Sequence, residues 1–309
     1  MRRRLVIVIM MISLAACGGS EAATTTTAAE FEPTSTIATV PESPEPTLEP
    51  GEEPDTYWVT NPSSGSRLSV SVFYPQDWAG GTLPALLLVP GGSGLIDPKR
   101  AESLTEFGFL VITFDPEGRG SSEGVEDHNG YVGQDGLAAV AVAALELPGL
   151  DEEAFGMVSF SYGITNAAGA LARHPDLPID FLIDWEGPVD RWYTTSGCGP
   201  QANESRRIEW PSCTEDEWWS QREAITFVDE IAVPYQRVQS EKDHVQSENQ
   251  HAVDAVNAAV AGGAPWVRLN DYPAGTTFDE VPSMLPESED KRLEATIARY
   301  AWEIIDGVL

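Results

Sequence analysis

The sequence predicts an α/β fold in which helices cover both faces of a mostly parallel sheet. Two observations predict it. Short, continuous apolar runs alternate with longer segments of helical periodicity over most of residues 56–309. One of these runs, residues 154–160, leads into the sharp turn Ser161-Tyr162-Gly163 and then into an alanine-rich segment that ends at His174. We therefore expect a strand, a turn that carries a serine, and a helix at the centre of the architecture.

Eight strands and five helices are expected in this region. The strands are Tyr57–Thr60, Arg67–Tyr74, Ala85–Val89, Phe109–Phe114, Phe155–Phe160, Phe181–Trp185, Val233–Gln239 and Trp266–Leu269. The helices are Pro98–Phe107, Val132–Leu147, Tyr162–His174, Ser247–Ala261 and Asp290–Ile305. No helix separates the first two strands, so we expect these two to form an antiparallel meander before the parallel part begins.

The first residues have the pattern of an export signal. Three arginines precede an apolar run of signal-peptide length, and Leu14-Ala15-Ala16 precede Cys17. This resembles the lipobox of bacterial lipoproteins, which implies that residues 1–16 are removed and Cys17 is lipidated. The protein would then be exported and held by acyl chains at a membrane, in the periplasm or at the cell surface. An ordinary cleaved signal and a short membrane helix are the alternatives, and the run is short for a span.

The remaining chain divides by composition. Residues 17–55 are rich in threonine, alanine, proline and glutamate and have few large apolar residues, which predicts a disordered tether. Residues 56–309 have the length of one large α/β domain. The formal net charge of the whole chain is −31. Such a surface repels phosphates, so nucleic acids and anionic substrates are not expected as partners.

Two further cysteines lie close together in the sequence. Cys198 and Cys213 sit within one tryptophan-rich segment of a chain that is expected to be exported. A disulfide between them is therefore expected, because disulfides persist in oxidising compartments. Metal binding is the alternative, but no histidine lies nearby to complete a zinc set. The chain shows no nucleotide-binding glycine pattern and no metal constellation, so no cofactor or metal is expected.

Four stretches of the sequence carry a resemblance to a known family. They are the loop Leu86–Gly94, the glycine-bearing turn Phe114–Gly124, the elbow Ser159–Gly163 and the stretch Val233–Asp243. In this order they resemble the α/β-hydrolases, broadly those of the dienelactone hydrolase or serine-peptidase-like kind. The resemblance implies an eight-stranded sheet with helices on both faces. It also implies that residues 190–228, after the sixth expected strand, form a cap.

The cap segment is rich in aromatic residues beside the expected disulfide. These are Trp192, Tyr193, Trp210, Trp218 and Trp219. Such a lid would shape an apolar or carbohydrate-friendly pocket over the serine, or the tryptophans would simply pack the lid onto the sheet. Both interpretations stay open.

The resemblance implies a nucleophile and an oxyanion hole. Ser161 takes the nucleophile position of the G-x-S-x-G turn, with Ser159 in place of the first glycine. A helix N-cap serine is the alternative. The hole would use the backbone N–H of Tyr162 and one from Gly92 or Ser93. A small molecule or a peptide with an ester, lactone or peptide bond would be the substrate.

The orienting acid is expected at Asp243, which follows the seventh expected strand where the family places it. An ordinary surface aspartate is the alternative. Asp184 and Glu186, after the sixth expected strand, are substitutes, because some hydrolases carry the acid there.

The base is harder to place. The family carries its histidine in the loop after the last strand, but Thr276 stands at that position, and threonine cannot accept a proton near neutral pH. His174 ends a helix, where a cation is favourable, and His128 is expected at the surface. His244 directly follows Asp243, and adjacent residues seldom place an imidazole between a carboxylate and a distant hydroxyl. His251, expected early in a helix, could be pointed toward the site by a helical turn and is the candidate base, with a packed or surface histidine as the alternative.

Two functions follow from these residues. In the first, the chain is an exported, membrane-anchored serine hydrolase that uses Ser161, Asp243 and His251. In the second, it is a catalytically inactive binding protein on a hydrolase scaffold, which lost its activity with the histidine at Thr276.

Overall fold

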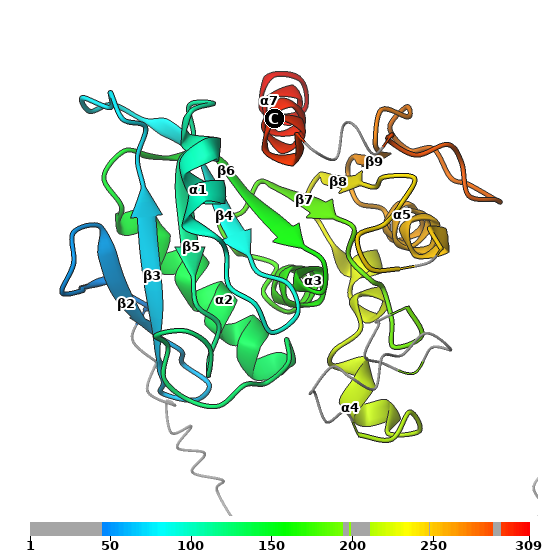
Figure 1. The fold of residues 1–309 in the computed structure, drawn as a ribbon, viewed down its shortest axis with the longest axis horizontal. Coiled ribbons are helices and arrows are strands. Elements are labelled where there is room, and N and C mark those ends of the chain that lie inside the picture. The colour runs from blue at the N-terminus through cyan, green and yellow to red at the C-terminus, as the bar shows by residue number, and fades with distance from the viewer. Residues whose placement is uncertain (1–44, 194–197, 199–210, 247, 287–291) are drawn as a thin grey trace, which may run out of the picture. The chain divides into compact units, whose positions relative to one another are not determined.

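The computed structural model describes residues 45–309, apart from residues 194–197, 199–210, 247 and 287–291 (Figure 1). All described residues belong to one unit that starts at Ser43. The expected signal, Cys17 and the tether before residue 45 lie outside the described residues, so export and lipidation stay predictions. No helix of the described ranges is long and apolar enough to cross a membrane.

The described strands form one nine-stranded sheet. They are β1 (Glu49–Pro50), β2 (Thr56–Thr60), β3 (Arg67–Phe73), β4 (Leu83–Val89), β5 (Leu110–Phe114), β6 (Leu150–Phe160), β7 (Phe181–Trp185), β8 (Tyr235–Val238) and β9 (Val267–Leu269). Eight of them are the expected strands. The ninth strand, β1, lies within residues 17–55, which were expected to be a tether, and it pairs with β2. Two residues are too few to show an alternating pattern, which is why the sequence did not predict this strand.

The strand order places the site. The sheet runs β1-β2-β3-β5-β4-β6-β7-β8-β9, and pairing is antiparallel as far as β3 with β5 and parallel beyond. The expected antiparallel opening and parallel core are therefore confirmed. Ser159 pairs with Asp184, and Asp184 pairs with Arg237, so the carboxyl ends of β6, β7 and β8 lie side by side.

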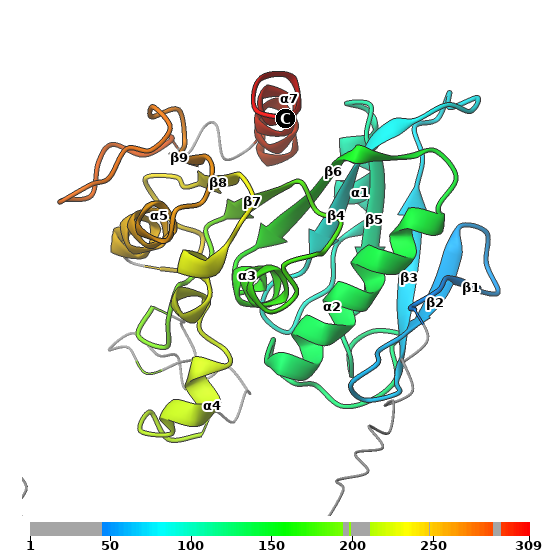
Figure 2. The ribbon, with the colours of Figure 1, turned by 180° about the vertical axis from the view of Figure 1, so that it is seen from behind.

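Helices cover both faces of the sheet, as Figures 1 and 2 show from opposite sides. The described helices of eight or more residues are α1 (Pro98–Thr105), α2 (Tyr131–Ala143), α3 (Gly163–Arg173), α5 (Gln250–Gly262) and α7 (Leu293–Gly307). Leu86 and Leu88 of β4 pack in the cluster that contains residues of α1 and α7. Leu87 and Val89, which point to the opposite face, pack with residues of α2, α3 and α5.

The segment between β7 and β8 is the expected cap. Its described elements are α4 (Asp216–Ser220) and two 3-10 helices, η2 (Ala224–Thr226) and η3 (Val228–Glu230). The expected disulfide between Cys198 and Cys213 is present. Arg191 lies beside it, because its carbonyl accepts from the Cys198 N–H at 2.6 Å and its guanidinium donates to the Cys213 carbonyl at 2.9 Å.

The cap tryptophans do not all behave alike. Trp219 is fully buried and donates its indole N–H to the Ser212 carbonyl at 3.1 Å, whereas Trp192 is 56% exposed. Trp210 lies outside the described residues. The packing interpretation therefore holds for Trp219.

Candidate active site

Ser161 lies on a strained turn between β6 and α3. Its φ of 52° is in the left-handed region, which costs on the order of 1–3 kcal/mol for a residue with a side chain. Its N–H donates to the Trp185 carbonyl at 2.8 Å, which continues the ladder with β7 by one residue. Tyr162 is the N-cap residue of α3, so Ser161 is not a helix cap. The turn instead lifts the serine out of the sheet.

Two glycines let the loop after β4 lie against this turn. A Cβ on Gly91 would stand 2.4 Å from the Phe160 carbonyl oxygen and 2.8 Å from the Ser161 Cβ. A Cβ on Gly163 would stand 2.7 Å from the Val89 carbonyl oxygen. Both approaches leave room only for glycine. The loop that carries the expected oxyanion donors Gly92 and Ser93 therefore packs on the serine turn.

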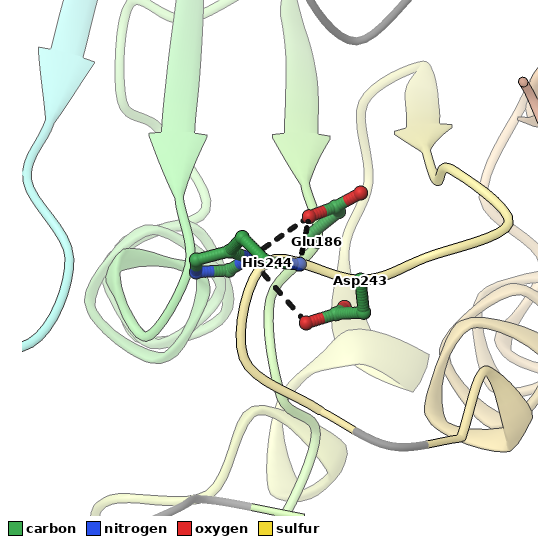
Figure 3. Close-up of side chains that lie close together, drawn as sticks. All are labelled: Glu186, Asp243 and His244. Atoms are coloured by element: carbon green, nitrogen blue, oxygen red, sulfur yellow. Dashed lines mark hydrogen bonds and ion pairs between the residues drawn. The ribbon is translucent and has the colours of Figure 1, made fainter. Parts of the chain in front are cut away.

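The imidazole of His244 lies on Ser161. Its Nε2 is 2.9 Å from Ser161 Oγ, and its Nδ1 is 2.8 Å from Glu186 Oε2. Figure 3 shows the second contact, together with the Asp243 carboxylate on the other side of the same nitrogen. His244 can therefore reach Ser161 although it directly follows Asp243, contrary to the expectation from the sequence, because Glu186 supplies the carboxylate on its Nδ1.

Glu186 is built to hold this imidazole. It follows the last residue of β7, its φ of 48° turns the chain, and it is fully buried. Its Oε2 also accepts the His244 backbone N–H at 2.8 Å. Its Oε1 accepts the Ser240 N–H at 3.1 Å and the Ser240 hydroxyl. A buried carboxylate with four donors is satisfied and fixed, and so is the ring that it holds.

Asp243, the expected acid, lies further from the His244 ring than Glu186 does. Its Oδ1 is 3.4 Å from His244 Nδ1 and accepts the N–H groups of Val245 at 2.8 Å and Gln246 at 2.6 Å. Burial raises the pKa of its carboxyl, but bonds from two imidazoles, the Gln239 amide and a backbone N–H outweigh burial and lower the pKa well below its usual range.

The two carboxylates change the basicity of His244. Burial lowers the pKa of the imidazole, but the hydrogen bonds and charges of Asp243 and Glu186 outweigh it and raise the pKa to about 9. The indole of Trp185 stacks on the ring with centroids 4.5 Å apart and an angle of 27° between the planes. An aromatic face also favours the charged form of a ring that it stacks on.

The expected base, His251, occupies a different place. It is fully buried at the start of α5, and its Nδ1 contacts Arg237 at 3.1 Å and the Gly187 carbonyl at 3.0 Å. Its Nε2 lies 3.3 Å from Asp243 Oδ2. His251 is thus held in the core through its Nδ1, with its Nε2 facing a carboxylate, and is not the imidazole on Ser161.

The remaining candidates also lie elsewhere. Thr276 donates its hydroxyl to the Pro273 carbonyl at 2.6 Å, within its own loop. His174 pairs with Asp135 at 2.8 Å at the end of α3, the structural position expected for it. Asp184, a substitute acid, forms a buried ion pair with Arg237. It is therefore not the carboxylate that contacts His244.

No metal site is expected from the sequence, yet one nitrogen and two carboxylate oxygens gather here. The ligand atoms of Glu186, Asp243 and His244 all lie within 4.8 Å of one another, a spacing at which they could hold a metal ion. The same atoms already share hydrogen bonds with the imidazole and with backbone N–H groups. Two carboxylates on one imidazole nitrogen also fit a base that is held in place beside Ser161 without an ion.

The residue after the serine links the site to the cap. The Tyr162 hydroxyl donates to the Arg222 carbonyl at 2.8 Å, and the Tyr162 carbonyl accepts from the Asn129 amide at 2.8 Å. Arg222 also forms an ion pair with Asp127. Tyr162 is fully buried, and burial raises the pKa of its phenol far above the usual value. The cap is thus bonded directly to the expected oxyanion residue.

Comparisons with known proteins agree with this architecture. No protein-family model and no curated protein sequence matches the chain. Est1E from Butyrivibrio proteoclasticus, solved with ferulic acid, is similar with a TM-score of 0.57 and 18% identity, over 79% of this chain and 97% of that chain. DcsB, solved with a substrate analogue, has a TM-score of 0.59 and 13% identity, over 84% of this chain and 100% of that chain.

A longer protein is similar over part of its length. A puromycin-hydrolysing peptidase of Mycobacterium tuberculosis has a TM-score of 0.56 and 15% identity, over 84% of this chain but 38% of the peptidase. At these identities the similarity is one of fold.

Proposed function

We propose, from the α/β-hydrolase fold of this chain and the imidazole on its elbow serine, that the protein is a serine hydrolase. Its substrate would be a small molecule or a peptide with an ester, lactone or peptide bond. The contact of 2.9 Å between His244 Nε2 and Ser161 Oγ carries the proposal. The similar solved proteins include one that hydrolyses puromycin and one with bound ferulic acid, which supports this substrate range.

In the proposed reaction, Ser161 Oγ attacks the substrate carbonyl carbon and His244 Nε2 takes the hydroxyl proton. Glu186 accepts the Nδ1–H and stabilises the imidazolium that forms. The backbone N–H groups of Tyr162 and of Gly92 or Ser93 hold the oxyanion. The imidazolium then gives its proton to the leaving group, which departs and leaves an acyl-serine. Water, deprotonated by His244, releases the acid product and restores Ser161.

This triad differs from the expected one in its base and acid. Ser161 follows β6, Glu186 follows β7 and His244 follows β8, so three neighbouring strands supply the three groups. The missing histidine at Thr276, on which the inactive alternative rested, is then no obstacle to catalysis.

Labelling with a fluorophosphonate tests the proposal. The purified protein should react at one serine, while Ser161→Ala should not react and His244→Ala should react at least about 100-fold more slowly, the typical contribution of a general base. Ser220→Ala, which should label like the native protein, is the matched control, since this cap serine donates its hydroxyl to the Glu217 carbonyl and has no part in the proposed triad. Absence of labelling at alkaline pH, together with no turnover of activated esters, would leave the inactive binding protein.

We also propose that the protein is exported and anchored by lipidated Cys17. The lipobox-like residues before Cys17 support this, and so does the disulfide, which persists in oxidising compartments. Metabolic labelling with an alkyne fatty acid should mark the native chain in membranes. A Cys17→Ser variant should lose the label, and a labelled variant would contradict the assignment.

A further inference from the structure

Asp243 lies beside the catalytic imidazole but is held from behind. Its side chain is fully buried, and its Oδ2 accepts the Gln239 amide at 3.0 Å and lies 3.3 Å from His251 Nε2. Its Oδ1 accepts two backbone N–H groups and faces His244 Nδ1 at 3.4 Å. The carboxylate therefore joins two imidazoles, one in the core and one at the site.

The support of Asp243 continues into the core. Arg237 of β8 is fully buried and donates to His251 Nδ1 at 3.1 Å and to Gln239 Oε1 at 2.6 Å. It also forms a buried ion pair with Asp184 of β7. Arg237 pairs directly with Asp184 and attracts Asp243 only from behind Gln239 and His251, so the imidazole of His244 is the group that Asp243 meets on the side of the site.

The charges within ion-pair distance of the His244 ring have one sign, and Arg100 from α1 lies beyond the stacked Trp185 ring, 5.9 Å from its centroid. Glu186 and Asp243 are the titratable groups within ion-pair distance of its ring in the described residues, and both are carboxylates. Behind them lie His251 from α5 and the balanced pair of Arg237 and Asp184. The Trp185 ring from β7 stacks on the imidazole. A single carboxylate suffices to orient a histidine, so the second one adds charge rather than orientation.

We propose that Asp243 is a second carboxylate on the imidazole, whose charge holds His244 as an imidazolium at neutral pH and so keeps Ser161 inactive until the medium is alkaline. Glu186 fixes the tautomer, and Asp243, fixed by Gln239 and His251, supplies the additional charge. The role in catalysis rests on the proposed function of Ser161, whereas the charge of His244 does not. The chain would thus work best well above neutral pH.

An NMR titration tests this without any substrate. The chain has four histidines, and the resonances that His244→Gln removes identify the ring in question. The native ring should titrate near pH 9. Asp243→Asn, which keeps an oxygen for the Val245 and Gln246 N–H groups, should lower that midpoint by about 1 unit or more. Glu241→Gln, on the same loop but exposed, should leave the midpoint unchanged.

A midpoint in Asp243→Asn that stays within a few tenths of the native one would overturn the proposal, as would a native midpoint near 6.5. Should Asp243→Asn fail to fold, Asp243→Ser keeps a hydroxyl that can cap the same turn, and the same shift of the His244 midpoint is expected.

Failed labelling of Ser161 would refute the proposed hydrolase activity but would not change the expected titration of His244. If the hydrolase holds, the rise of kcat/KM with pH should move toward neutral pH in Asp243→Asn by the same amount, with the plateau kept within a few-fold. A lost plateau would show a merely structural role.

Discussion

Replacing Glu186 with glutamine should disable the site while keeping its shape. The native carboxylate accepts four hydrogen bonds, two from Ser240 and two from His244. A glutamine has one oxygen and one NH₂ group, so the NH₂ must face two donors on one side. Orienting the amide oxygen toward Ser240 turns the NH₂ toward His244 Nδ1 and favours the tautomer that carries its proton on Nε2. That tautomer cannot take the proton of Ser161.

Two magnitudes follow from this arrangement. Loss of the charged acceptor and of the correct tautomer should lower kcat by roughly 10³- to 10⁴-fold, as for other triads that lose their acid. The conflict between donors in a fully buried place should lower the free energy of unfolding by about 1–3 kcal/mol. The larger effect must therefore appear in the kinetics and the smaller one in the stability.

Hydrolysis of a p-nitrophenyl ester, measured beside urea unfolding, checks both values. Asp180→Asn is the matched control, because Asp180 lies just before β7 and accepts the Phe155 N–H at 2.8 Å, far from the site. It should lose stability and keep its rate. An activity of Glu186→Gln within tenfold of the native rate would refute the assignment of Glu186 as the orienting acid.

Three further predictions concern pH and the surroundings of the site. With a pKa of about 9, only roughly 1% of His244 is neutral at pH 7, so kcat/KM should rise about tenfold per pH unit between pH 6 and 8 and level off above pH 9; a profile that is flat from pH 7 would contradict this. A variant with serine at both Cys198 and Cys213, which are 15 residues apart, should lose about 3 kcal/mol of unfolding free energy in urea titrations, and unchanged stability would show that the loop is held by other contacts. Thr276→Ala removes a hydrogen bond to the Pro273 carbonyl and should leave kcat/KM unchanged; lost activity would mean that this loop takes part in catalysis after all.

The fold was largely predictable because its strands and helices differ clearly in pattern. Ala85–Val89 of β4, for example, is a continuous apolar run that is buried on both faces, as a central parallel strand requires. The strand that was not predicted is β1, at the edge of the sheet. The pairing of Glu49 and Pro50 with β2 depends on a partner rather than on any apolar pattern of its own.

The sequence predicted the serine of the candidate site, Ser161, but not the imidazole that contacts it, His244. The turn at Ser161 has a local pattern, because a strand, a small residue and a helix must meet there. The pairing of Glu186 with His244 has none, since it depends on two chain turns that bring distant residues together. Both residues were visible as candidates at the ends of neighbouring strands. With the acid expected at Asp243, the adjacent His244 was not expected to be the base, although Glu186 was already a substitute acid.

The three adjacent strands that carry the proposed triad have a consequence for the end of the chain. Ser161 and His244 are separated by 83 residues, and none of the three groups of the proposed triad comes from the described residues after the start of β9. The loop after β9, which includes Thr276, therefore supplies no group of the proposed triad. Insertions or changes of length in this loop should therefore leave the proposed reaction at Ser161 intact.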